Sequence, residues 1–526
     1  MSKRRHSGDP AASRLQAAAP AASIAAATAA ADFSLSESLV SQQPNPNTSH
    51  DAGPVTEAAA AIEQATVGLW VGRPSLSARE PPARWQIVVL STLIGGLAGV
   101  AIASPEAAAF LLTLLLAVPF LCVVALRTVA TVEILRAPVN PDVLPAVPRI
   151  PDPALPIYSL LVPLFDEADV LPRLLKALGA LDYPSDRLDI LLILEEADPA
   201  TRAAILSVRL PSQYRVIVVP DVQPRTKPKA LNYALAQARG SFVVVYDAED
   251  IPEPGQLRGA LAVFARSGPE LACLQARLNI DRPDASLLTR QFTLEYSALF
   301  DALLPALERL ALPVPLGGTS NHFRADVLRR IGAWDPFNMT EDADLGIRLA
   351  RLGYRTETFA STTWEEAPAD LGNWLRQRTR WLKGWMQTYL VHTRHPRRLL
   401  RDLGARGHLG FHVLMGGILL SVLAYPVSCG LLAVGIWQER LFAAPDSDFE
   451  GWLWWIAAIN LGLGVGSSML VAALAVVRRQ RAWLAPWVLL MPVYWLLISL
   501  AGYRALVQLV RQPFLWEKTR HGQAEE

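Results

Sequence analysis

The chain has 526 residues, a formal net charge of +1 at neutral pH and a hydrophobic content of 52%. So small a charge argues against a dedicated nucleic-acid-binding protein, which needs a cationic excess to neutralise phosphates, so no nucleic acid is expected among its partners. The hydrophobic content exceeds that of an ordinary soluble domain, and membrane-spanning segments are therefore expected. The three cysteines are scattered and form neither a disulfide framework nor a CxxC metal motif.

Residues 1–84 are rich in Ala, Ser, Pro and Gln and show no sustained apolar period. Such a segment cannot bury enough surface to offset the entropy of ordering it, so we predict a disordered tail, within which residues 55–71 could form a short helix. No apolar core follows the basic residues at positions 3–5, so a cleavable secretion signal is not expected.

Two uncharged apolar runs follow, at residues 86–103 and 107–126. Each is long enough to cross the hydrocarbon core of a bilayer, which predicts two transmembrane helices within residues 85–127. Arg84 precedes the pair and Arg127 follows it, so both outer flanks are expected on the cytoplasmic side.

Residues 407–510 predict three or more further transmembrane helices, with apolar runs at residues 409–437, 451–477 and 482–503. The loop after the first run is acidic and the next is Arg478-Arg-Gln-Arg481, which places the acidic loop outside and the arginine loop inside. One more simple crossing would leave the basic C-terminal segment, residues 511–526, outside. Either Pro492 breaks the last run into a re-entrant pair, or this basic segment lies outside.

Just before those runs, residues 371–406 are predicted to form helices, first a helix that clamps a ligand and then one that lies at the membrane interface. Aromatic residues alternate there with arginines, a pattern typical of an amphipathic interface helix followed by a lipid-facing basic patch. His408 and His412 stand four residues apart, but no acidic or Cys ligand is near in sequence, so a metal site is not expected there.

Between the apolar runs, residues 150–370 alternate short apolar strands with helical periods. The predicted strands lie at residues 158–162, 189–194, 214–219 and 242–246, and the predicted helices at 171–181, 200–207 and 230–238. This alternation predicts an α/β domain with right-handed crossovers. Ligands of such sheets bind beyond the carboxyl ends of the strands, so the polar residues just after each strand are the candidates for function.

Carboxylates follow the first two predicted strands. Asp166 and Asp198 could accept hydrogen bonds from a nucleoside or could cap the helices that they precede, and both interpretations stay open. Glu196 directly follows a buried strand, and we assign it to the nucleotide. Lys227 opens a helix whose N-terminus is suited to phosphate.

Asp247-Ala-Glu-Asp250 comes directly after the fourth strand. Three acids at the end of a buried strand repel one another unless a cation compensates, and oxygen ligands in this number suit Mg²⁺ or Mn²⁺ bridged to a diphosphate. A merely solvated acidic turn fits poorly with an origin inside a sheet.

Three further motifs follow. Gly317-Gly-Thr-Ser-Asn321 allows close approach and could line an acceptor pocket, although it could also be only a turn. Thr340-Glu-Asp342 fits the start of a helix on capping grounds alone. Gln377, Arg380 and Trp381 share one helical face, which suits a diphosphate and a sugar ring. A basic membrane-interface helix is the alternative for this face, and both readings can hold together.

In this order, Asp247-x-Glu249, Thr340-Glu-Asp342 and Gln377-x-x-Arg380-Trp381 resemble the motif set of membrane-embedded, inverting family-2 glycosyltransferases, which include cellulose, hyaluronan and chitin synthases. The sequences around these motifs are similar to the glycosyltransferase part of bacteriophage-adsorption protein B. They are Tyr246-Asp-Ala-Glu-Asp250, Gly317-Gly-Thr-Ser-Asn-His322, Arg376-Gln-Arg378 and Trp516-Glu-Lys-Thr519. The resemblance covers roughly residues 156–400. It implies a GT-A-type domain with a parallel or mixed sheet, inserted between transmembrane helices of a multi-pass protein. Such a protein would lie in a bacterial inner membrane with its catalytic domain in the cytoplasm.

The resemblance also implies roles for individual residues. Asp342 matches the general base, and Asp247 and Glu249 match the acids that hold Mg²⁺ or Mn²⁺, with Glu249 in place of the usual second aspartate. The residues implied to bind the nucleotide sugar are Glu196, Lys227, Asp247, Gln377 and Arg380. Those implied to contact the acceptor are Gly318, Thr319, Ser320, Glu341 and Trp381. Residues 516–519 resemble a mobile segment that covers the donor site in some relatives.

The sequence therefore predicts a glycosyltransferase that uses a nucleotide diphosphate sugar, a UDP-sugar, to elongate a β-linked extracellular or cell-surface polysaccharide. Its expected partners are a glycan or lipid-linked acceptor, the lipid bilayer and export proteins. One alternative is non-processive transfer of one sugar to a lipid carrier, but the Gln-x-x-Arg-Trp motif favours polymerisation. The other is a membrane scaffold that has lost catalysis, against which the intact acids argue.

Overall fold

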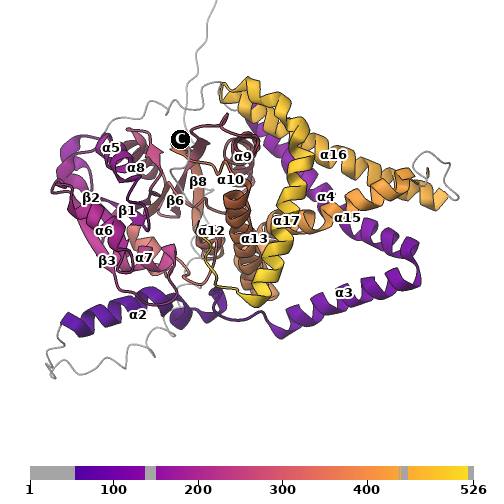
Figure 1. Ribbon diagram of the computed structural model, residues 1–526, viewed down its shortest axis with the longest axis horizontal. Coiled ribbons are helices and arrows are strands. Elements are labelled where there is room, and N and C mark those ends of the chain that lie inside the picture. Colours follow the sequence, from indigo (N-terminus) through magenta and orange to yellow (C-terminus); the bar gives the residue numbers. More distant parts are fainter. Residues whose placement is uncertain (1–53, 137–149, 438, 440–447, 519–526) are drawn as a thin grey trace, which may run out of the picture. The chain divides into compact units, whose positions relative to one another are not determined.

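The computed structural model describes residues 54–136, 150–437, 439 and 448–518. Its central domain is built on one eight-stranded sheet in the order β3-β2-β1-β4-β7-β6-β8-β5 (Figure 1). The strands are β1 Tyr158–Leu164, β2 Leu188–Glu195, β3 Tyr214–Val219, β4 Phe242–Val245, β5 Ile251–Pro252, β6 Leu271–Ile280, β7 Asn321–Arg324 and β8 Arg355–Glu365. Strands β1 to β4 are parallel, whereas β7 runs antiparallel to β4 and β6, so the sheet is mixed.

Helices pack on both faces of this sheet. They are α5 Leu171–Gly179, α6 Pro199–Leu206, α7 Lys227–Leu235, α8 Gln256–Arg266, α9 Leu287–Ala298, α10 Leu304–Arg309, α11 Ala325–Arg330, α12 Glu341–Arg351 and α13 Leu371–Thr393. The four predicted strands and three predicted helices lie within about two or three residues of their expected positions, an ordinary error for element ends.

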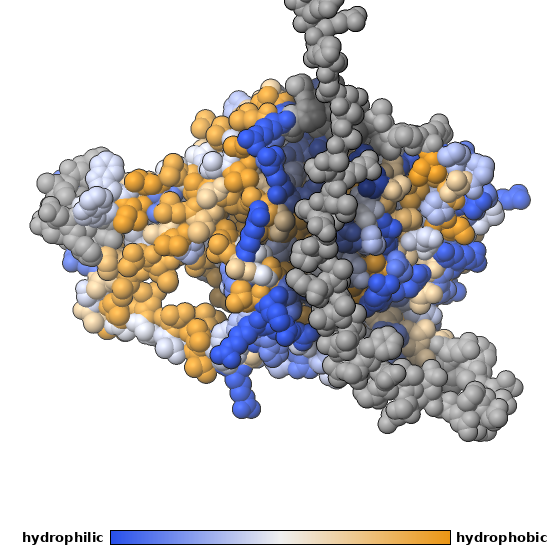
Figure 2. Space-filling view, turned by 180° about the vertical axis from the view of Figure 1, so that it is seen from behind, coloured by the Kyte–Doolittle hydropathy of each residue, from blue (hydrophilic) through white to orange (hydrophobic). Residues whose placement is uncertain are grey.

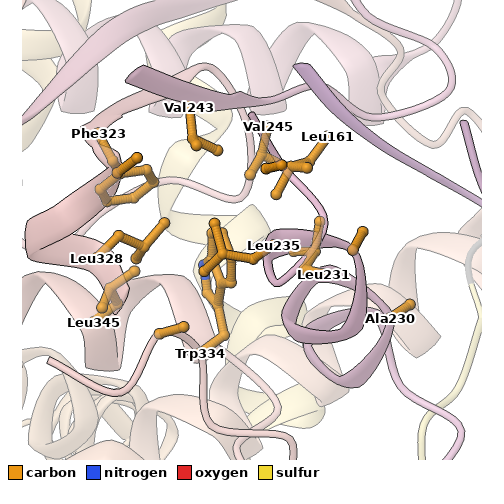
Figure 3. Close-up of a cluster of buried hydrophobic side chains, with 14 of the residues drawn as sticks. Leu161, Ala230, Leu231, Leu235, Val243, Val245, Phe323, Leu328, Trp334 and Leu345 are labelled. Carbon is orange, nitrogen blue, oxygen red and sulfur yellow. The ribbon is translucent and has the colours of Figure 1, made fainter. Parts of the chain in front are cut away.

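The alternation of side chains along β4 divides the core between these faces. Val243 and Val245 point into the cluster that α7, α11 and α12 cover, whereas Val244 packs on the other face with α5 and α8. Figure 3 shows the first cluster, in which Trp334 lies beneath the strands and beside Leu235 of α7. Because each buried Val or Leu contributes about 1.5–3 kcal/mol, the two faces fix where β4 ends.

The prediction of a disordered segment up to residue 84 is wrong for its described part from residue 58 onward. The helix α2, Pro54–Gly72, which the sequence suggested as a short helix, packs on the domain with a buried stripe that comprises Ile62, Ala65, Thr66 and Leu69. Asn232 of α7 donates to the Ala65 carbonyl at 3.0 Å. Gly332 has a positive φ and lies so close to Leu69 that a Cβ would meet its side chain. The spacing i, i+3, i+4, i+7 forms an apolar face that α7 and this turn cover.

Among the described residues, five helical segments are long and apolar enough to cross a membrane by length and composition, at Arg84–Ala103, Pro105–Arg136, Pro396–Trp437, Trp455–Arg478 and Ala482–Arg511. They comprise α3 Arg84–Ala103, α4 Pro105–Arg136, α14 Pro396–Phe411, α15 Gly417–Trp437, α16 Asp448–Arg478, the short helix Ala482–Leu490 and α17 Met491–Arg511. Figure 2 shows that hydrophobic surface gathers over the part of the molecule that these helices form, whereas the sheet domain is far more hydrophilic. A surface of this kind suits a multi-pass membrane protein.

The last apolar run is broken, as one of the two sequence alternatives requires. The short helix ends at Leu490, and α17 begins at Met491 with Pro492 in its first turn. Both flanks of the run contact the central domain. Arg481 donates to the Ile280 carbonyl at 2.9 Å, and Lys518 donates to the Asp166 carbonyl at 2.9 Å. Because both flanks touch one domain, we expect this segment to begin and end on the same side of the membrane.

The surface of α17 agrees with this position. One side, which includes Tyr494, Ala501 and Ala505, is buried against α13 and neighbouring helices. The opposite side exposes apolar side chains at helical spacing, Val493, Leu496, Leu500, Val507 and Val510. Both sides of α17 are therefore apolar, so the side that is not packed on protein faces lipid, which is compatible with this position.

We expect the two flanks of this run to be accessible from one side of the membrane. In a chain with alanine at positions 122, 273 and 429, cysteines introduced at the exposed Gln480 and Gln512 should react with an impermeant maleimide from the same side. Glu439→Cys should react only from the other side, because α15 and α16 each cross once. Labelling of Gln480→Cys and Gln512→Cys from opposite sides would show instead that α17 spans the bilayer.

Candidate active site

The acids predicted at the end of β4 divide into two kinds. Asp250 is buried, and its Oδ2 accepts from the Asp247 backbone N–H at 2.6 Å and from the Thr319 hydroxyl. This carboxylate therefore closes the turn and ties it to the loop before β7. Asp247 and Glu249 are only partly buried and remain as the acids of this motif that could meet a ligand.

Lys227 links this turn to the other motifs. Its ammonium forms an ion pair with Asp247 and donates to the Gly318 carbonyl at 2.8 Å. Burial would lower the pKa of Lys227, but the carboxylates of Asp247, Glu341 and Asp342 together raise it above its ordinary value. A lysine of this kind stays charged and is placed to stabilise an anion at the N-terminus of α7.

The Thr340-Glu-Asp342 motif begins α12, as the capping pattern indicates. Asp342 Oδ1 accepts from the Ala343 N–H at 2.6 Å, and a Cβ on Gly318 would lie 3.3 Å from Asp342 Oδ2. Burial raises the pKa of Asp342 to about 6, although the Ala343 N–H and Lys227 oppose the rise. Burial and Asp342 raise the pKa of Glu341 to about 8. Asp342 is thus ionised at neutral pH and more basic than an ordinary aspartate, which suits a general base.

Helix α13 is fastened to the loop that precedes Asp342. A Cβ on Gly384 would lie 2.4 Å from the Thr340 backbone nitrogen, so only glycine allows this approach. Gln387 accepts from the Met339 N–H at 2.9 Å, and Thr388 accepts from Asn338 at 2.9 Å. These contacts fix the helix that carries Gln377, Arg380 and Trp381 relative to α12.

The predicted face of α13 lies at the site. Burial lowers the pKa of the Arg380 guanidinium. The negative charges of four carboxylates offset part of this lowering, those of Glu341, Asp247, Asp342 and Glu249. Gln377 is buried, and its Oε1 has no hydrogen-bond partner among the described residues. An orphaned amide oxygen in such a place is costly unless a ligand donates to it.

The Trp381 ring, which the sequence assigns to a sugar contact, is already packed against other side chains. Its ring packs against Tyr296 and Phe292 of α9, with centroids 6.3 Å and 5.9 Å away. Arg378 lies over the same ring at 4.9 Å and forms a fork with Glu295 of α9, with both distances 2.7 Å. Trp381 is therefore part of an aromatic cluster that borders the site.

A C-terminal segment, residues 516–518, crosses the site, and Thr519 lies outside the described residues. The Trp516 ring stacks on the Arg380 guanidinium at 4.6 Å. Glu517 accepts from Arg504 of α17 at 2.8 Å, and Lys518 pairs with Glu167 at 3.2 Å after β1. The segment thus joins α17 to the carboxyl edge of the sheet and lies over Arg380.

Glu365 at the end of β8 belongs to the same acid cluster and was missed from the sequence. Burial, Glu249 and Asp247 raise its pKa, and a hydrogen bond from Tyr296 opposes the rise. Glu365 is the last residue of β8, so only recognition of that strand could have pointed to it. Strand β8 itself was not predicted, so this position was not recognised.

Of the acids after β1 and β2, Asp198 is a helix cap, whereas the Asp166 side chain caps no helix and lies 3.6 Å from the Lys518 ammonium. Asp198 accepts from the Thr201 N–H at 3.1 Å and from the Asp166 N–H at 2.5 Å, so it caps α6. Glu196 is exposed at the end of β2 and accepts from the Asp221 N–H at 3.1 Å. The structure therefore favours the capping interpretation for Asp198, while the nucleotide contact of Glu196 stays a prediction.

A divalent cation fits this site only if the protein and the substrate share its coordination. No group of three or more His, Cys, Asp or Glu side chains among the described residues is arranged to hold a metal. Asp247 and Glu249 offer two hard donors, so a cation would need further oxygens from a diphosphate and water. Burial and Asp247 raise the pKa of Glu249 to about 8, a sign of acids crowded without compensating charge.

Comparison with known proteins identifies the class of the domain that carries these residues. Residues 153–384 match the family described as "Glycosyltransferase like family 2". The match covers β1 to β8 and the first half of α13, and so contains Lys227, Asp247, Asp342 and Arg380. This domain is a glycosyltransferase domain, and its mixed α/β sheet between apolar helices is the predicted GT-A-like class.

Three curated relatives are similar over this domain. They are the "Probable glycosyltransferase YdaM" of Bacillus subtilis (strain 168), at 29% identity over 44% of this chain and 55% of its own; the "Beta-monoglucosyldiacylglycerol synthase" of Synechocystis sp. (strain ATCC 27184 / PCC 6803 / Kazusa), at 26% over 70% and 76%; and the "Poly-beta-1,6-N-acetyl-D-glucosamine synthase" of Staphylococcus aureus (strain MSSA476), at 24% over 44% and 55%. The chain thus spans about half the length of the first and third relatives.

Among solved structures, the chain is similar to the mannosyltransferase PcManGT of Pyrobaculum calidifontis, determined in complex with GDP-Man and Mn²⁺. The TM-score is 0.45 and the identity 19%, over 75% of this chain and 99% of the other.

We expect the pH profile of turnover to reflect the raised pKa of Asp342. Because a base must be ionised to accept a proton, kcat/KM should fall about tenfold per pH unit below about pH 6. Initial rates between pH 4.5 and 8 would measure this limb. A limb near pH ~4, the ordinary aspartate range, would contradict this environment for Asp342.

Removal of the Trp516 ring should weaken donor binding more than it slows the chemical step. A stacked cation–π contact contributes about 0.5–2 kcal/mol, so Trp516→Ala should raise KM for the donor roughly 2- to 30-fold. Trp452→Ala, which removes an exposed ring on α16, is the control. Equal KM values for the two variants would show that Trp516 does not act on the donor.

Proposed function

We propose that the protein is an inverting membrane glycosyltransferase that uses a nucleotide diphosphate sugar, a UDP-sugar, to elongate a β-linked extracellular or cell-surface polysaccharide. The observation that carries the proposal is the position of Asp342. This basic carboxylate lies next to Gly318 and acts on the same lysine, Lys227, that pairs with Asp247. A base thus lies beside a cationic binding site for a leaving diphosphate, the combination that glycosyl transfer requires.

In the proposed reaction, Asp342 accepts the proton of an acceptor hydroxyl as its oxygen forms a bond to the anomeric carbon. The bond from that carbon to the diphosphate oxygen breaks on the opposite face, and the electron pair leaves with the nucleoside diphosphate. Lys227 and Arg380 stabilise the charge that develops on the diphosphate. A Mg²⁺ or Mn²⁺ ion held between Asp247, Glu249 and the donor would supply further charge stabilisation.

Several residues would position the two substrates. Gln377, through its orphaned Oε1, is placed to accept a hydrogen bond from the donor. On the acceptor side we propose Glu341, Trp381 and the loop Gly318-Thr-Ser320. Of these, Thr319 and Ser320 are fully buried and bond to Asp250 and Thr363, so they shape the loop and would act on the acceptor through its backbone. Glu196 remains our candidate for the nucleoside.

We further propose that the domain lies in the cytoplasm of a bacterium, at the inner membrane. Arginines 478, 479 and 481 follow α16 next to the domain, and Arg479 forms a fork with Asp301. Basic connections lie on the cytoplasmic side as a rule. Export of the product would then need partner proteins or a path through the helices. The wording of the motifs supports the branch of bacteriophage-adsorption protein B.

Transfer of a single sugar to a membrane lipid is the second candidate. It is supported by the similarity to the beta-monoglucosyldiacylglycerol synthase, which covers more of both chains than the polysaccharide synthase does. The Gln-x-x-Arg-Trp motif on α13 supports polymer synthesis instead. The length of the product separates these candidates.

We expect the detergent-purified protein with Mg²⁺ or Mn²⁺ to release nucleoside diphosphate from one member of a panel of nucleotide sugars. Asp342→Asn should reduce release about 100-fold or more while donor binding persists, because the base is lost and the cationic residues remain. Asp326→Asn, at an exposed carboxylate on α11, is the matched control.

The outcomes of this assay are distinct. Chromatography of the labelled product would show a polymer for the first candidate and a monoglycosylated lipid for the second. Near-normal turnover by Asp342→Asn would remove this residue from the role of base. If the protein neither bound any nucleotide sugar nor released nucleoside diphosphate from it, the scaffold interpretation would be favoured.

A further inference from the structure

A basic groove lies where α3 enters the membrane, away from the proposed active site. It is lined by Trp85 and by residues 394–398 and 401, and its volume is about 900 Å³. We call it the α14 groove, because residues 394–401 form the link from α13 and the first turns of α14. The transfer reaction uses none of its residues.

The charge of the α14 groove is mostly uncompensated. Arg398 and Arg401 have side-chain exposures of 51% and 77%, and each lies 3.8 Å from Asp402, beyond hydrogen-bond distance. Asp402 is instead held by Arg351 of α12 through two bonds of 2.8 Å and 3.1 Å. Glu80, another acid near Arg394, accepts from Trp70 at 2.6 Å. Arg397 is also exposed, so at least three guanidinium groups face solvent without a closely bonded carboxylate.

The base of the α14 groove is rigid. Arg394 is 7% exposed and donates to the carbonyls of Ser75, Ser77 and Glu80, whereas its Nε has no hydrogen-bond partner among the described residues. Trp85 donates to the Arg394 carbonyl at 3.1 Å, and this bond joins the first turn of α3 to the α13–α14 link. A preformed cationic site loses little side-chain entropy when an anion binds.

The position of Trp85 at the start of an apolar helix fits the depth of lipid headgroups. After Trp85 and the buried Gln86, α3 continues with side chains exposed by 48–62%, Ile87, Val88, Val89 and Leu90. These residues begin an apolar segment long enough to span the bilayer, and a helix rises only 1.5 Å per residue. A half-exposed tryptophan at the start of such a segment marks the membrane–water interface.

We propose that the α14 groove binds the phosphate of an anionic phospholipid from the leaflet in which α3 begins. Arginines match phosphate in geometry as well as in charge, and the Trp85 ring can pack against the glycerol and first acyl carbons. A clustered basic surface beside a transmembrane helix attracts anionic headgroups and is indifferent to neutral ones. This proposal does not depend on the transfer reaction.

Native mass spectrometry of the delipidated full chain tests the proposal by titration with phosphatidylglycerol or phosphatidylcholine. The wild type should bind phosphatidylglycerol in preference, and Arg397→Gln/Arg398→Gln/Arg401→Gln should weaken that binding about tenfold or more and leave phosphatidylcholine binding unchanged. The control Arg202→Gln/Arg209→Gln/Arg266→Gln removes the same charge from exposed positions of the sheet domain and should bind as the wild type. Should the triple variant not fold, Arg401→Gln alone should weaken binding about fivefold.

Three results would overturn the proposal. They are equal binding of the two lipids by the wild type, an equal loss in the control variant, and full displacement of phosphatidylglycerol by an equal concentration of inorganic phosphate. The last result would assign the groove to a free phosphate and not to a lipid.

Discussion

The crowding of carboxylates around Lys227 is the constraint on which this site depends. Asp247, Glu341 and Asp342 all act on its ammonium. Buried acids at such density are unfavourable unless cations offset them, and the high pKa values of Glu341 and Glu249 mean that the protein's own cations do not suffice. A free diphosphate would add to the repulsion, whereas a diphosphate with its divalent cation would relieve it. The electrostatics therefore favour the metal-bound donor that we propose.

The fold sustains this arrangement because each acid is held by backbone contacts of its own. Asp250 accepts hydrogen bonds that close the turn after β4 and hold Thr319, so it is not used as a ligand. Gly384 brings α13 against Thr340 and thereby sets the distance between the base and Arg380. The parallel half of the sheet supplies Lys227 and Asp247, and the returning β7 supplies Gly318. The site thus arises at the junction between the parallel and antiparallel parts of one sheet.

The parallel half could be predicted from the sequence, whereas the returning half could not. Strands β1 to β4 are continuous apolar runs followed by polar residues, a strong local signal. Strand β7 has four residues and contains His322, which is buried and bonded to Tyr158 at 2.7 Å, so its strand character depends on its neighbours. The acids Asp247 and Asp342 could be found from motifs. Glu365 could not, because its position depends on a pairing of β8 with β6 that no local pattern encodes.

The docking of α2 was missed for a similar reason. Its buried stripe consists of Ile62, Ala65, Thr66 and Leu69 in an alanine-rich segment, so the apolar face is narrow and resembles that of an unstructured tail. Only the complementary turn at Gly332 and the Asn232 side chain make it a binding face. Helix propensity and composition describe a segment by itself, whereas the docking of α2 depends on the surface against which it packs.

Segments far apart in the sequence converge on the loop that carries the base. Ser77 and the Ala78 N–H bind the buried Asp335, whose pKa is raised by burial to about 6 and which also accepts from the Phe337 N–H at 3.2 Å. The Phe337 ring lies between Arg79, at 5.2 Å, and Phe514, at 5.4 Å. The loop leading to Asp342 is therefore held from one side by the segment after α2 and from the other by the segment that places Trp516 over Arg380. Residues 77–79 and Phe514 thus contribute to the position of this loop, although none of them belongs to the motifs of the site.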